Sequence, residues 1–342
     1  MLYRNRHLKR IALGMLFGAV AFSAEAGASK AWLSFDAPDS WLTSPHSINV
    51  HNVIVGQCQS SINFLARGFL RTPDGTITAF DAPDANQGTT AADINDAGDI
   101  TGSFVFFTDL QYTQGYVRHP DGTFEEFAVN GFRWTVPAAI NDRGTVVGYV
   151  QGNRTAPVAF LRESDGTAVL FLRNSDGSYA RSINRAGAIT GYYYRDGLMH
   201  GFVRGTGGKI TTFDPPDSVN TQPASINDKG EITGLYTGTD YFNRGFVREP
   251  DGTIITFDAP GAASQGTMPV AIDPNGNIAG TFYDSANNYH GFVRDSAGVI
   301  HTIDEPGQIS TAITAISRIG KVIGNDLDGH GVRAIARIWQ RH

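Results

Sequence analysis

Aromatic residues gather in several of the polar, glycine-rich segments that connect the β-patterned runs of this chain. Such rings can stack on sugar rings or anchor a protein partner. The predicted ligand-binding residues are Trp41, Trp134, Tyr112, Tyr193, Tyr194, Tyr241 and Phe242. The alternative is that these rings pack inward, because the adjoining β-patterned runs are themselves rich in aromatic residues. Both interpretations stay open at this point.

Two further residues, His46 and Arg181, are candidates for lining a central channel. They hold equivalent places in a repeated pattern, and most other copies hold small residues there. Those residues are Ala92, Ala138, Ala224, Val270 and Thr314. His200 and His290 are also equivalent to each other, but they belong to separate copies. We interpret this second pair as structural histidines rather than ligands of a shared metal ion.

The repeated Asn-Asp-x-Gly segments could be read as calcium loops, most of all the segment from Asp93 to Asp99. A calcium loop places oxygen ligands at alternating positions and ends on a bidentate carboxylate. Here Ala97 breaks the alternation, and the copy at Arg318-Ile319-Gly320 has no acid. The segments are interpreted as hairpin turns, in which Asn and Asp bond to the local backbone and Gly accepts a positive φ.

The sequence contains no catalytic triad motif, glycine-rich phosphate loop or Cys/His metal cluster. We therefore expect a non-enzymatic binding module without a catalytic residue, metal or cofactor. The alternative is a secreted polysaccharide hydrolase or lyase with a channel-mouth active site. Its carboxylates, His and Arg would come from several copies of the repeat and leave no local motif.

These candidates must be positioned by a repeat that recurs along the chain. An Ile is followed eight residues later by a Gly in seven copies, and the Ile residues lie 43 to 46 residues apart. The pairs are Ile48/Gly56, Ile94/Gly102, Ile140/Gly148, Ile183/Gly191, Ile226/Gly234, Ile272/Gly280 and Ile316/Gly324. A period in the forties with turn residues and β-formers is typical of propeller blades.

One copy, residues 221–258, contains four short β-patterned runs and no helical periodicity. In chain order the runs a, b, c and d are Pro223–Ile226, Glu231–Tyr236, Gly245–Arg248 and Thr253–Phe257. The a–b and c–d turns keep constant lengths, whereas the b–c and d–a connections vary by three residues. Because variable loops carry function on a constant scaffold, we expect the binding site on the b–c/d–a face.

The two ends of the repeat array complement each other. Trp32–Pro38 matches run d without preceding runs, and Ala334–Arg337 matches run c without a following run d. The sequence therefore predicts an all-β, seven-bladed β-propeller of four-stranded blades, in which an N-terminal strand completes the last blade. Such closure removes exposed sheet edges.

The succession of IND-x-G-x-I-x-G, HGFV or GFVR, and DGT-x-x-x-FDAP resembles the bacterial HAF-repeat proteins, predicted extracellular repeats named for a His-Ala-Phe tripeptide. His200-Gly201-Phe202 and His290-Gly291-Phe292 are the nearest matches to that tripeptide. The resemblance extends over residues 27–342. It implies export and a propeller-like fold, and it supplies no catalytic residues.

The N-terminal segment predicts export. Residues 1–26 combine a basic start, an apolar stretch and an Ala24-Glu25-Ala26 cleavage pattern, which are typical of a signal peptide. We expect residues 27–342 to form one propeller domain, monomeric, periplasmic or extracellular, and without a membrane span. A net charge of −6 argues against nucleic-acid binding. The expected partner is a glycan, a cell-envelope component or a protein.

Overall fold

The computed structural model describes residues 32–342 except 130, 264–265, 309, 328–331 and 339–342. The predicted signal peptide, residues 1–26, lies outside the described residues. Every regular element is a β-strand, and there are 28 of them among these residues. No helix in this part of the chain has the length and apolar character needed to cross a membrane.

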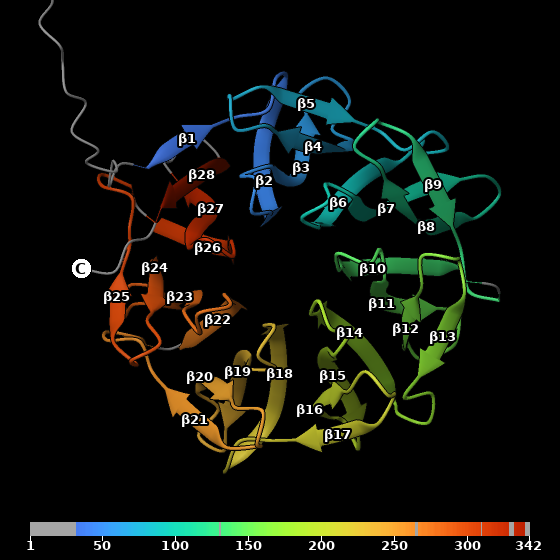
Figure 1. Ribbon diagram of the computed structural model, residues 1–342. Helices are drawn as coiled ribbons and strands as arrows, with labels where there is room; N and C mark the ends of the chain where they lie inside the picture. Colours follow the sequence, from blue (N-terminus) through green and yellow to red (C-terminus); the bar gives the residue numbers. More distant parts are fainter. Residues whose placement is uncertain (1–31, 130, 264–265, 309, 328–331, 339–342) are drawn as a thin grey trace, which may run out of the picture.

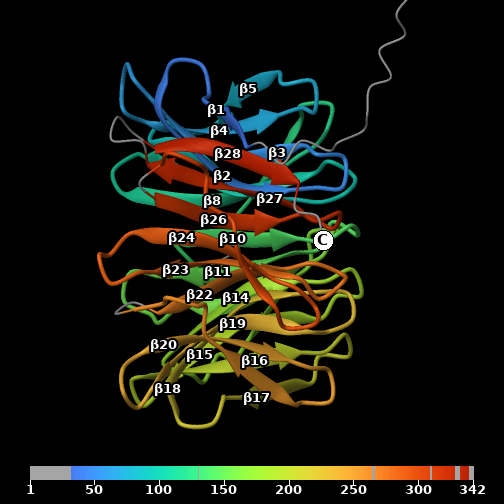
Figure 2. The same cartoon turned by 90° about the vertical axis from the view of Figure 1, so that its left-hand side faces the viewer.

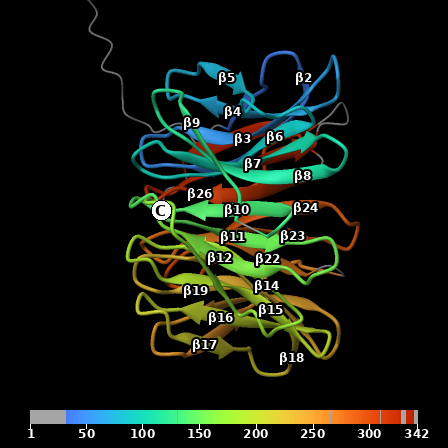
Figure 3. The same cartoon turned by 90° about the vertical axis from the view of Figure 1, so that its right-hand side faces the viewer.

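Four-stranded antiparallel sheets stand in a ring around a central axis (Figure 1). In each sheet the strands follow the order a, b, c, d from the axis to the rim. Since neighbours are antiparallel, the a–b and c–d turns emerge on one face of the ring and the b–c and d–a connections on the other. Figures 2 and 3 show the ring edge-on, with connections on both faces.

The bounds of the strands follow their place in the sheet. The inner strands, a, are β2 (Ser40–Ile48), β6 (Gly88–Ile94), β10 (Trp134–Ile140), β14 (Gly177–Ile183), β18 (Ser218–Ile226), β22 (Thr267–Ile272) and β26 (Ser310–Ile316). The second strands, b, are β3 (Ile54–Ser60), β7 (Ile100–Phe107), β11 (Val146–Gln151), β15 (Ile189–Arg195), β19 (Ile232–Gly238), β23 (Ile278–Tyr283) and β27 (Lys321–Leu327). The third strands, c, are β4 (Ala66–Arg71), β8 (Gln111–Arg118), β12 (Val158–Arg162), β16 (Leu198–Arg204), β20 (Asn243–Arg248), β24 (Tyr289–Arg294) and β28 (Val332–Ile338). The outer strands, d, are β5 (Ile77–Phe80), β9 (Phe124–Phe127), β13 (Ala168–Phe171), β17 (Ile210–Phe213), β21 (Ile254–Phe257), β25 (Ile300–Thr302) and β1 (Leu33–Phe35).

The first strand of the chain pairs with the last. β1 lies antiparallel to β28, with Leu33 opposite Ala336 and Phe35 opposite Ala334. Isolated parallel pairs, Leu42 with Val332 and Trp134 with Thr113, join neighbouring sheets at two places in the ring. The prediction of an all-β propeller built from four-stranded antiparallel sheets is therefore confirmed.

A β-bulge in every inner strand explains the Ile–Gly signature. In β18 the bulge lies between Pro223 and Ser225, and Gly234 of β19 is paired with Pro223. A Cβ on Gly234 would overlap the carbonyl oxygen of Gln222. Only glycine lets the second strand approach the bulge this closely. Because proline needs no ladder hydrogen bond at a bulge, β18 continues through Pro223 and begins at Ser218, five residues before the predicted run.

The hydrophobic core lies between neighbouring sheets. A fully buried ring on six of the seven third strands meets the edge of a ring on the preceding sheet's outer strand, as Phe246 does with Phe213 at 6.0 Å, while β28 has Ile335 at that place. The arginine two residues after the buried ring lies over that outer ring: the Arg248 guanidinium is 5.0 Å from the Phe213 centroid. Equivalent pairs include Arg118 with Phe80 and Arg294 with Phe257. Apolar and cation–π contacts thus join the sheets at corresponding places.

The FDAP segments anchor the d–a connections. The N–H of Ala82 donates to the hydroxyl of Thr89 at 3.0 Å, and Ala259 donates to Thr267 in the same way at 2.8 Å. Both threonines are fully buried. These bonds fix the start of β6 and of β22, and thereby the side chains that these inner strands present to the axis.

Candidate functional site

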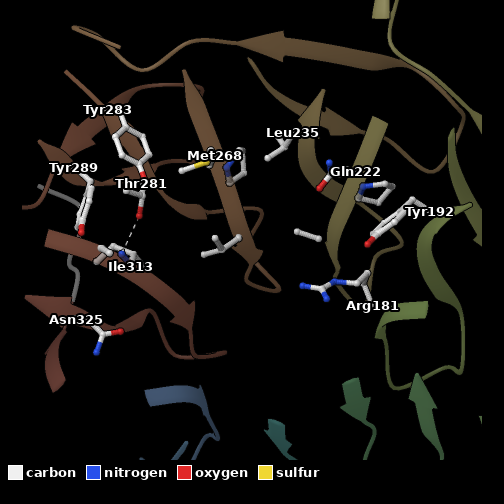
Figure 4. A pocket seen from close by; sticks show the side chains of 15 residues that line it. Arg181, Tyr192, Gln222, Leu235, Met268, Thr281, Tyr283, Tyr289, Ile313 and Asn325 are labelled. Atoms are coloured by element: carbon white, nitrogen blue, oxygen red, sulfur yellow. Dashed lines mark hydrogen bonds between the residues drawn. The ribbon is translucent and has the colours of Figure 1, made fainter. Parts of the chain in front are cut away.

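A pocket of about 600 Å³ opens around the central axis. Its walls come from the sheets between β14 and β27 (Figure 4). Tyr283, the last residue of a second strand, and Tyr289, the first residue of the following third strand, lie at its rim. These residues flank a b–c connection, so the pocket opens toward the face on which connection lengths vary.

The inner strands give the pocket its depth. Arg181, Ala224 and Val270 occupy the same repeat position on β14, β18 and β22, two residues before the terminal Ile of each strand. Gln222 and Met268 lie two residues nearer the b–c/d–a face. The guanidinium of Arg181 therefore lies deeper in the pocket than the tyrosine rings at the rim.

The lining combines apolar surface with few charges. Its residues are Arg181, Tyr192, Gln222, Pro223, Ala224, Leu235, Met268, Pro269, Val270, Thr281, Tyr283, Tyr289, Ala312, Ile313 and Asn325. Arg181 carries the single formal charge of this set, and no carboxylate belongs to it. A mostly apolar pocket with a few polar groups is typical of small-molecule sites.

Two polar lining residues are already engaged by the protein. The Thr281 hydroxyl accepts a hydrogen bond from the Ile313 N–H at 3.0 Å, the dashed line in Figure 4. The Asn325 side chain donates to the Thr43 carbonyl at 3.0 Å. These bonds fix the wall formed by β23, β26 and β27, and they leave Arg181 and Gln222, on the opposite wall, available to a ligand together with the hydroxyls of the lining tyrosines.

Four tyrosine rings form a cluster, and one of them, Tyr192, lines the pocket with Arg181. Tyr179 stacks on Tyr192, with ring centroids 5.0 Å apart, and meets Tyr149 at 4.8 Å and Tyr194 at 6.3 Å. Desolvation raises the pKa of Tyr179 to about 12 and also raises that of Tyr192, on which the charge of Arg181 acts in the opposite direction. The phenols therefore stay neutral at physiological pH, and Arg181 lies close enough to influence them.

Hydrogen bonds between turns encircle the opposite mouth of the channel, where the turn residues line a smaller pocket of about 190 Å³. The a–b turns form a ladder in which the side-chain amide of one turn donates to the backbone carbonyl of the next. The donors are Asn49, Asn95, Asn141, Asn184 and Asn227, and the acceptors are Asn95, Asn141, Asn184, Asn227 and Asp273. The same asparagines accept bonds from the N–H groups of their own turns, as Asn141 does from Arg143 and Thr145.

Two arginines cross this second mouth. Arg185 contacts Asp142 at 2.5 Å and Asp96 at 2.6 Å, and Arg318 contacts Asp228 at 2.5 Å. We call these five residues the Arg–Asp clasp. Asp96 and Asp142 also accept backbone N–H groups from neighbouring turns. The turn carboxylates are thus paired with protein groups, in agreement with their interpretation as turns.

The second channel candidate, His46, is turned toward its neighbour in the ring. Its Nδ1 lies 2.7 Å from the carbonyl oxygen of Ala91, and burial lowers its pKa. It is not among the residues that line the 600 Å³ pocket. Of the two predicted channel residues, the structure therefore places only Arg181 in that pocket.

The predicted aromatic residues lie in different environments. Trp41 and Tyr241 are exposed, with 49% and 82% of their surface accessible. Tyr112 stacks on Phe106 at 5.3 Å, while Trp134 and Phe242 lie under Arg133 and Arg244. Tyr194 belongs to the tyrosine cluster described above. Tyr193 is buried against His200 and presents no ring to solvent.

Several lining residues escaped the sequence analysis. Gln222, Met268, Tyr283 and Tyr289 carry no motif, and their convergence depends on the curvature of the ring. Their position at the loop-facing ends of strands a, b and c was the available signal. Across the described residues, no group of three His, Cys, Asp or Glu has an arrangement that could hold a metal ion.

Comparisons with known proteins support the fold. The sequence matches no protein-family model and no curated protein. Virginiamycin B lyase from Staphylococcus aureus, solved with quinupristin, is similar over 90% of this chain and 99% of its own, at 14% identity and a TM-score of 0.61. The β-propeller domain of the trilobed protease from Pyrococcus furiosus aligns over 88% of this chain and 96% of its own, at 10% identity and a TM-score of 0.62.

A third similar structure is YCF48 bound to a D1 peptide. It covers 93% of this chain and 100% of its own, at 10% identity and a TM-score of 0.53. The three similar structures thus include a lyase, a protease domain and a peptide-binding protein. At these identities they show the β-propeller fold alone, and the resemblance to HAF-repeat proteins stays a prediction.

Proposed function

We propose that this chain is an exported, non-enzymatic β-propeller that binds its ligand on the b–c/d–a face. The observation that carries the proposal is the 600 Å³ pocket, which opens on that face and has an apolar, aromatic lining. A pocket of this size suits a small molecule or the inserted end of a larger ligand. The binding module acts in the periplasm or outside the cell as a monomer.

The proposal includes a ring of seven blades closed by β1. Its support is the division of the 28 strands into sets of four and the repetition of blade contacts at the junction. Phe35 of β1 meets Phe69 edge-on at 6.3 Å and lies 5.0 Å from the Arg71 guanidinium. Phe80 makes the same contacts with Tyr116 at 6.4 Å and Arg118 at 5.0 Å. Phe35 therefore takes the role of an outer-strand residue.

The proposed ligand is a glycan, a cell-envelope component or a protein. Exposed Trp41 and Tyr241 supply rings for stacking, and the half-buried rings of Tyr112, Trp134, Tyr194 and Phe242 lie on strands or connections of the same face. Aromatic side chains with one exposed surface suit both sugars and protein partners. The net negative charge of the chain disfavours nucleic acid.

An array of envelope polysaccharides and peptides, probed with the purified protein, tests the proposal. Ala224→Trp fills the pocket, and Ala97→Trp places the same side chain on an exposed a–b turn of the other face. We expect binding that Ala224→Trp abolishes and Ala97→Trp preserves. Absence of binding, or binding that survives Ala224→Trp, contradicts a site in the pocket. Trp41→Ala and Trp134→Ala measure the contribution of the outer rings.

The Arg–Asp clasp favours one alternative, a polysaccharide hydrolase or lyase. It brings acids within hydrogen-bond distance of arginine at a channel mouth, as the enzymatic hypothesis requires. Against it, the carboxylates of the clasp are held in ion pairs and also accept backbone N–H groups. The alternative would be established if the native protein cleaves the same polysaccharides, if Asp142→Asn abolishes the cleavage and if Ala224→Trp does not.

A further inference from the structure

Arg181 is an uncompensated cation in the wall of the pocket. Its guanidinium makes no hydrogen bond or ion pair with the residues that the structure describes, and Figure 4 shows it directed into the pocket. By contrast, Arg185 and Arg318 are held by carboxylates, and Arg248 lies over a phenyl ring. The Arg181 side chain is exposed to the open space of the pocket, so an anion can reach its charge, and the apolar surface beside it screens that attraction less than bulk water does.

A second unpaired polar group lies on the same wall. The Gln222 side chain has no hydrogen-bond partner among the described residues, and it projects from β18, next to the β14 strand that carries Arg181. Figure 4 shows Gln222 and Arg181 on the same side of the pocket, on either side of Tyr192. A guanidinium and an amide N–H provide donors for the two oxygens of one carboxylate.

The remaining surface is complementary to an apolar body. Leu235, Met268 and Val270 line the pocket between Arg181 and the opposite wall, where Tyr283 and Tyr289 stand with rings 5.3 Å apart. Methionine and tyrosine accommodate flat, polarizable groups. A single arginine balances one negative charge, which fits a monoanionic carboxylate better than a dianionic phosphate.

We propose that the pocket binds a small organic carboxylate with an aromatic or other apolar body. Arg181 binds the carboxylate from the deeper side and Gln222 from the side nearer the b–c/d–a face, and the body lies against Met268 and the tyrosine rim. This inference rests on the proposed function and adds the chemical class of the ligand. It makes Arg181 the residue that decides between a charged ligand and a neutral one of the same shape.

Matched pairs of acids and amides test the inference. The probes are 2-naphthylacetate and 4-phenylbutyrate, each with its primary amide, titrated by calorimetry or ligand-observed NMR. We expect each acid to bind the native protein about tenfold more tightly than its amide, since a charge-assisted hydrogen bond is roughly twice as strong as a neutral one. Arg181→Gln should reduce the ratio to about one, and Arg181→Lys should retain most of it.

The variants separate failure of the inference from failure of the proposed function. Equal affinity for acid and amide, both lost in Ala224→Trp, overturns the carboxylate and leaves the pocket as a binding site. Acid preference that persists in Arg181→Gln overturns the role of Arg181. If no probe binds, or if Ala224→Trp does not abolish the binding, the inference is wrong. The proposed function is then still tested separately by the array of polysaccharides and peptides. Thermal unfolding of Arg181→Gln should match that of the native protein, because the guanidinium has no protein partner to lose.

Discussion

At the scale of residues, an asparagine in five of the seven a–b turns joins one part of the ring to the next. Asn141 accepts hydrogen bonds from two N–H groups of its own turn and donates to the carbonyl of Asn184 in the neighbouring turn. The side chain is almost fully buried. The Asn of the repeated signature is therefore best understood as a connector within the scaffold, and the residues that break the repeat, such as Arg181, are the candidates for function.

Asn141→Ala should lower the free energy of unfolding by about 2–3 kcal/mol, because it leaves buried backbone donors and one acceptor without partners. Urea denaturation measures the change. Asn275→Ala is the matched control: this asparagine also lies in an a–b turn, its side chain is exposed and makes no hydrogen bond among the described residues. The control should change stability by less than about 0.5 kcal/mol. Equal effects of the two substitutions would refute the connecting role.

Asp93 should make stability depend on pH. Desolvation in the channel wall raises its pKa from 3.8 to about 6, although Ser47 and the Ile140 N–H bond to the carboxylate. Because the folded pKa exceeds the unfolded one, this contribution is present below about pH 4 and lost as pH rises through about 6. Urea denaturation of Asp93→Asn should therefore show a stability gain over the native protein that grows between pH 4 and pH 7. A constant difference across this range would contradict the raised pKa.

At the scale of elements, the bulge of each inner strand and the glycine of the second strand form one structural unit. The bulge changes the alternation of side chains, and its unpaired residue is Arg181 in β14, Ala224 in β18 and Val270 in β22. Without the bulge, a one-residue change in register would turn the channel-lining side chains toward the opposite face of the sheet. The scaffold signature thereby determines which residues reach the pocket.

Gly234→Ala should be severely destabilising, because the new Cβ would overlap backbone atoms of Gln222 and Pro223, which cannot move without breaking the sheet. We expect a loss of at least about 3 kcal/mol, or failure to fold. Gly207→Ala provides the control, since a Cβ there meets no atom within 4 Å. Far-UV circular dichroism and urea denaturation distinguish the two. A Gly234→Ala protein as stable as Gly207→Ala would show that the bulge is adaptable.

At the scale of the whole molecule, the ring gives its two faces different chemistry. One mouth is ringed by the asparagine ladder and the Arg–Asp clasp around a small polar pocket, and the other opens into an apolar pocket with one unpaired cation. The difference arises because the a–b turns repeat with constant length, whereas the residues at the pocket face differ from copy to copy. The proposed closure by β1 keeps the ring, and so the pocket, in one geometry.

Phe35→Ala tests that closure. The buried ring contacts Phe69 and Arg71, so its loss should cost about 3–4 kcal/mol and weaken the cover over the edge of β28. Concentration-dependent association in sedimentation experiments should accompany the loss, since an uncovered edge strand pairs with other chains. Leu33→Ala, at an exposed position of the same strand, should change neither property. If both variants behave as the native protein does, β1 is dispensable for the ring.

The sequence was sufficient to predict the strand order, the turns and the pairing of β1 with β28, because each depends on local spacing. Arg181 was also predicted as a channel residue, since it departs from the small residues of the other copies. The pocket as a whole could not be predicted: Arg181 and Tyr289 lie more than a hundred residues apart, and only the curvature of the ring brings them together. For the same reason, the sequence could not distinguish exposed Tyr241 from buried Tyr193.

Photo-crosslinking provides the most direct test of ligand binding in the pocket. The probe, 4-benzoylphenylacetate, is itself an aryl carboxylate, and its benzophenone reacts on illumination with neighbouring C–H bonds. We predict adducts on the peptide that contains Met268, with labelling lost in Ala224→Trp and strongly reduced in Arg181→Gln. Adducts on the a–b turns near Arg185 and Arg318, or labelling that neither substitution changes, would contradict a carboxylate site on the b–c/d–a face.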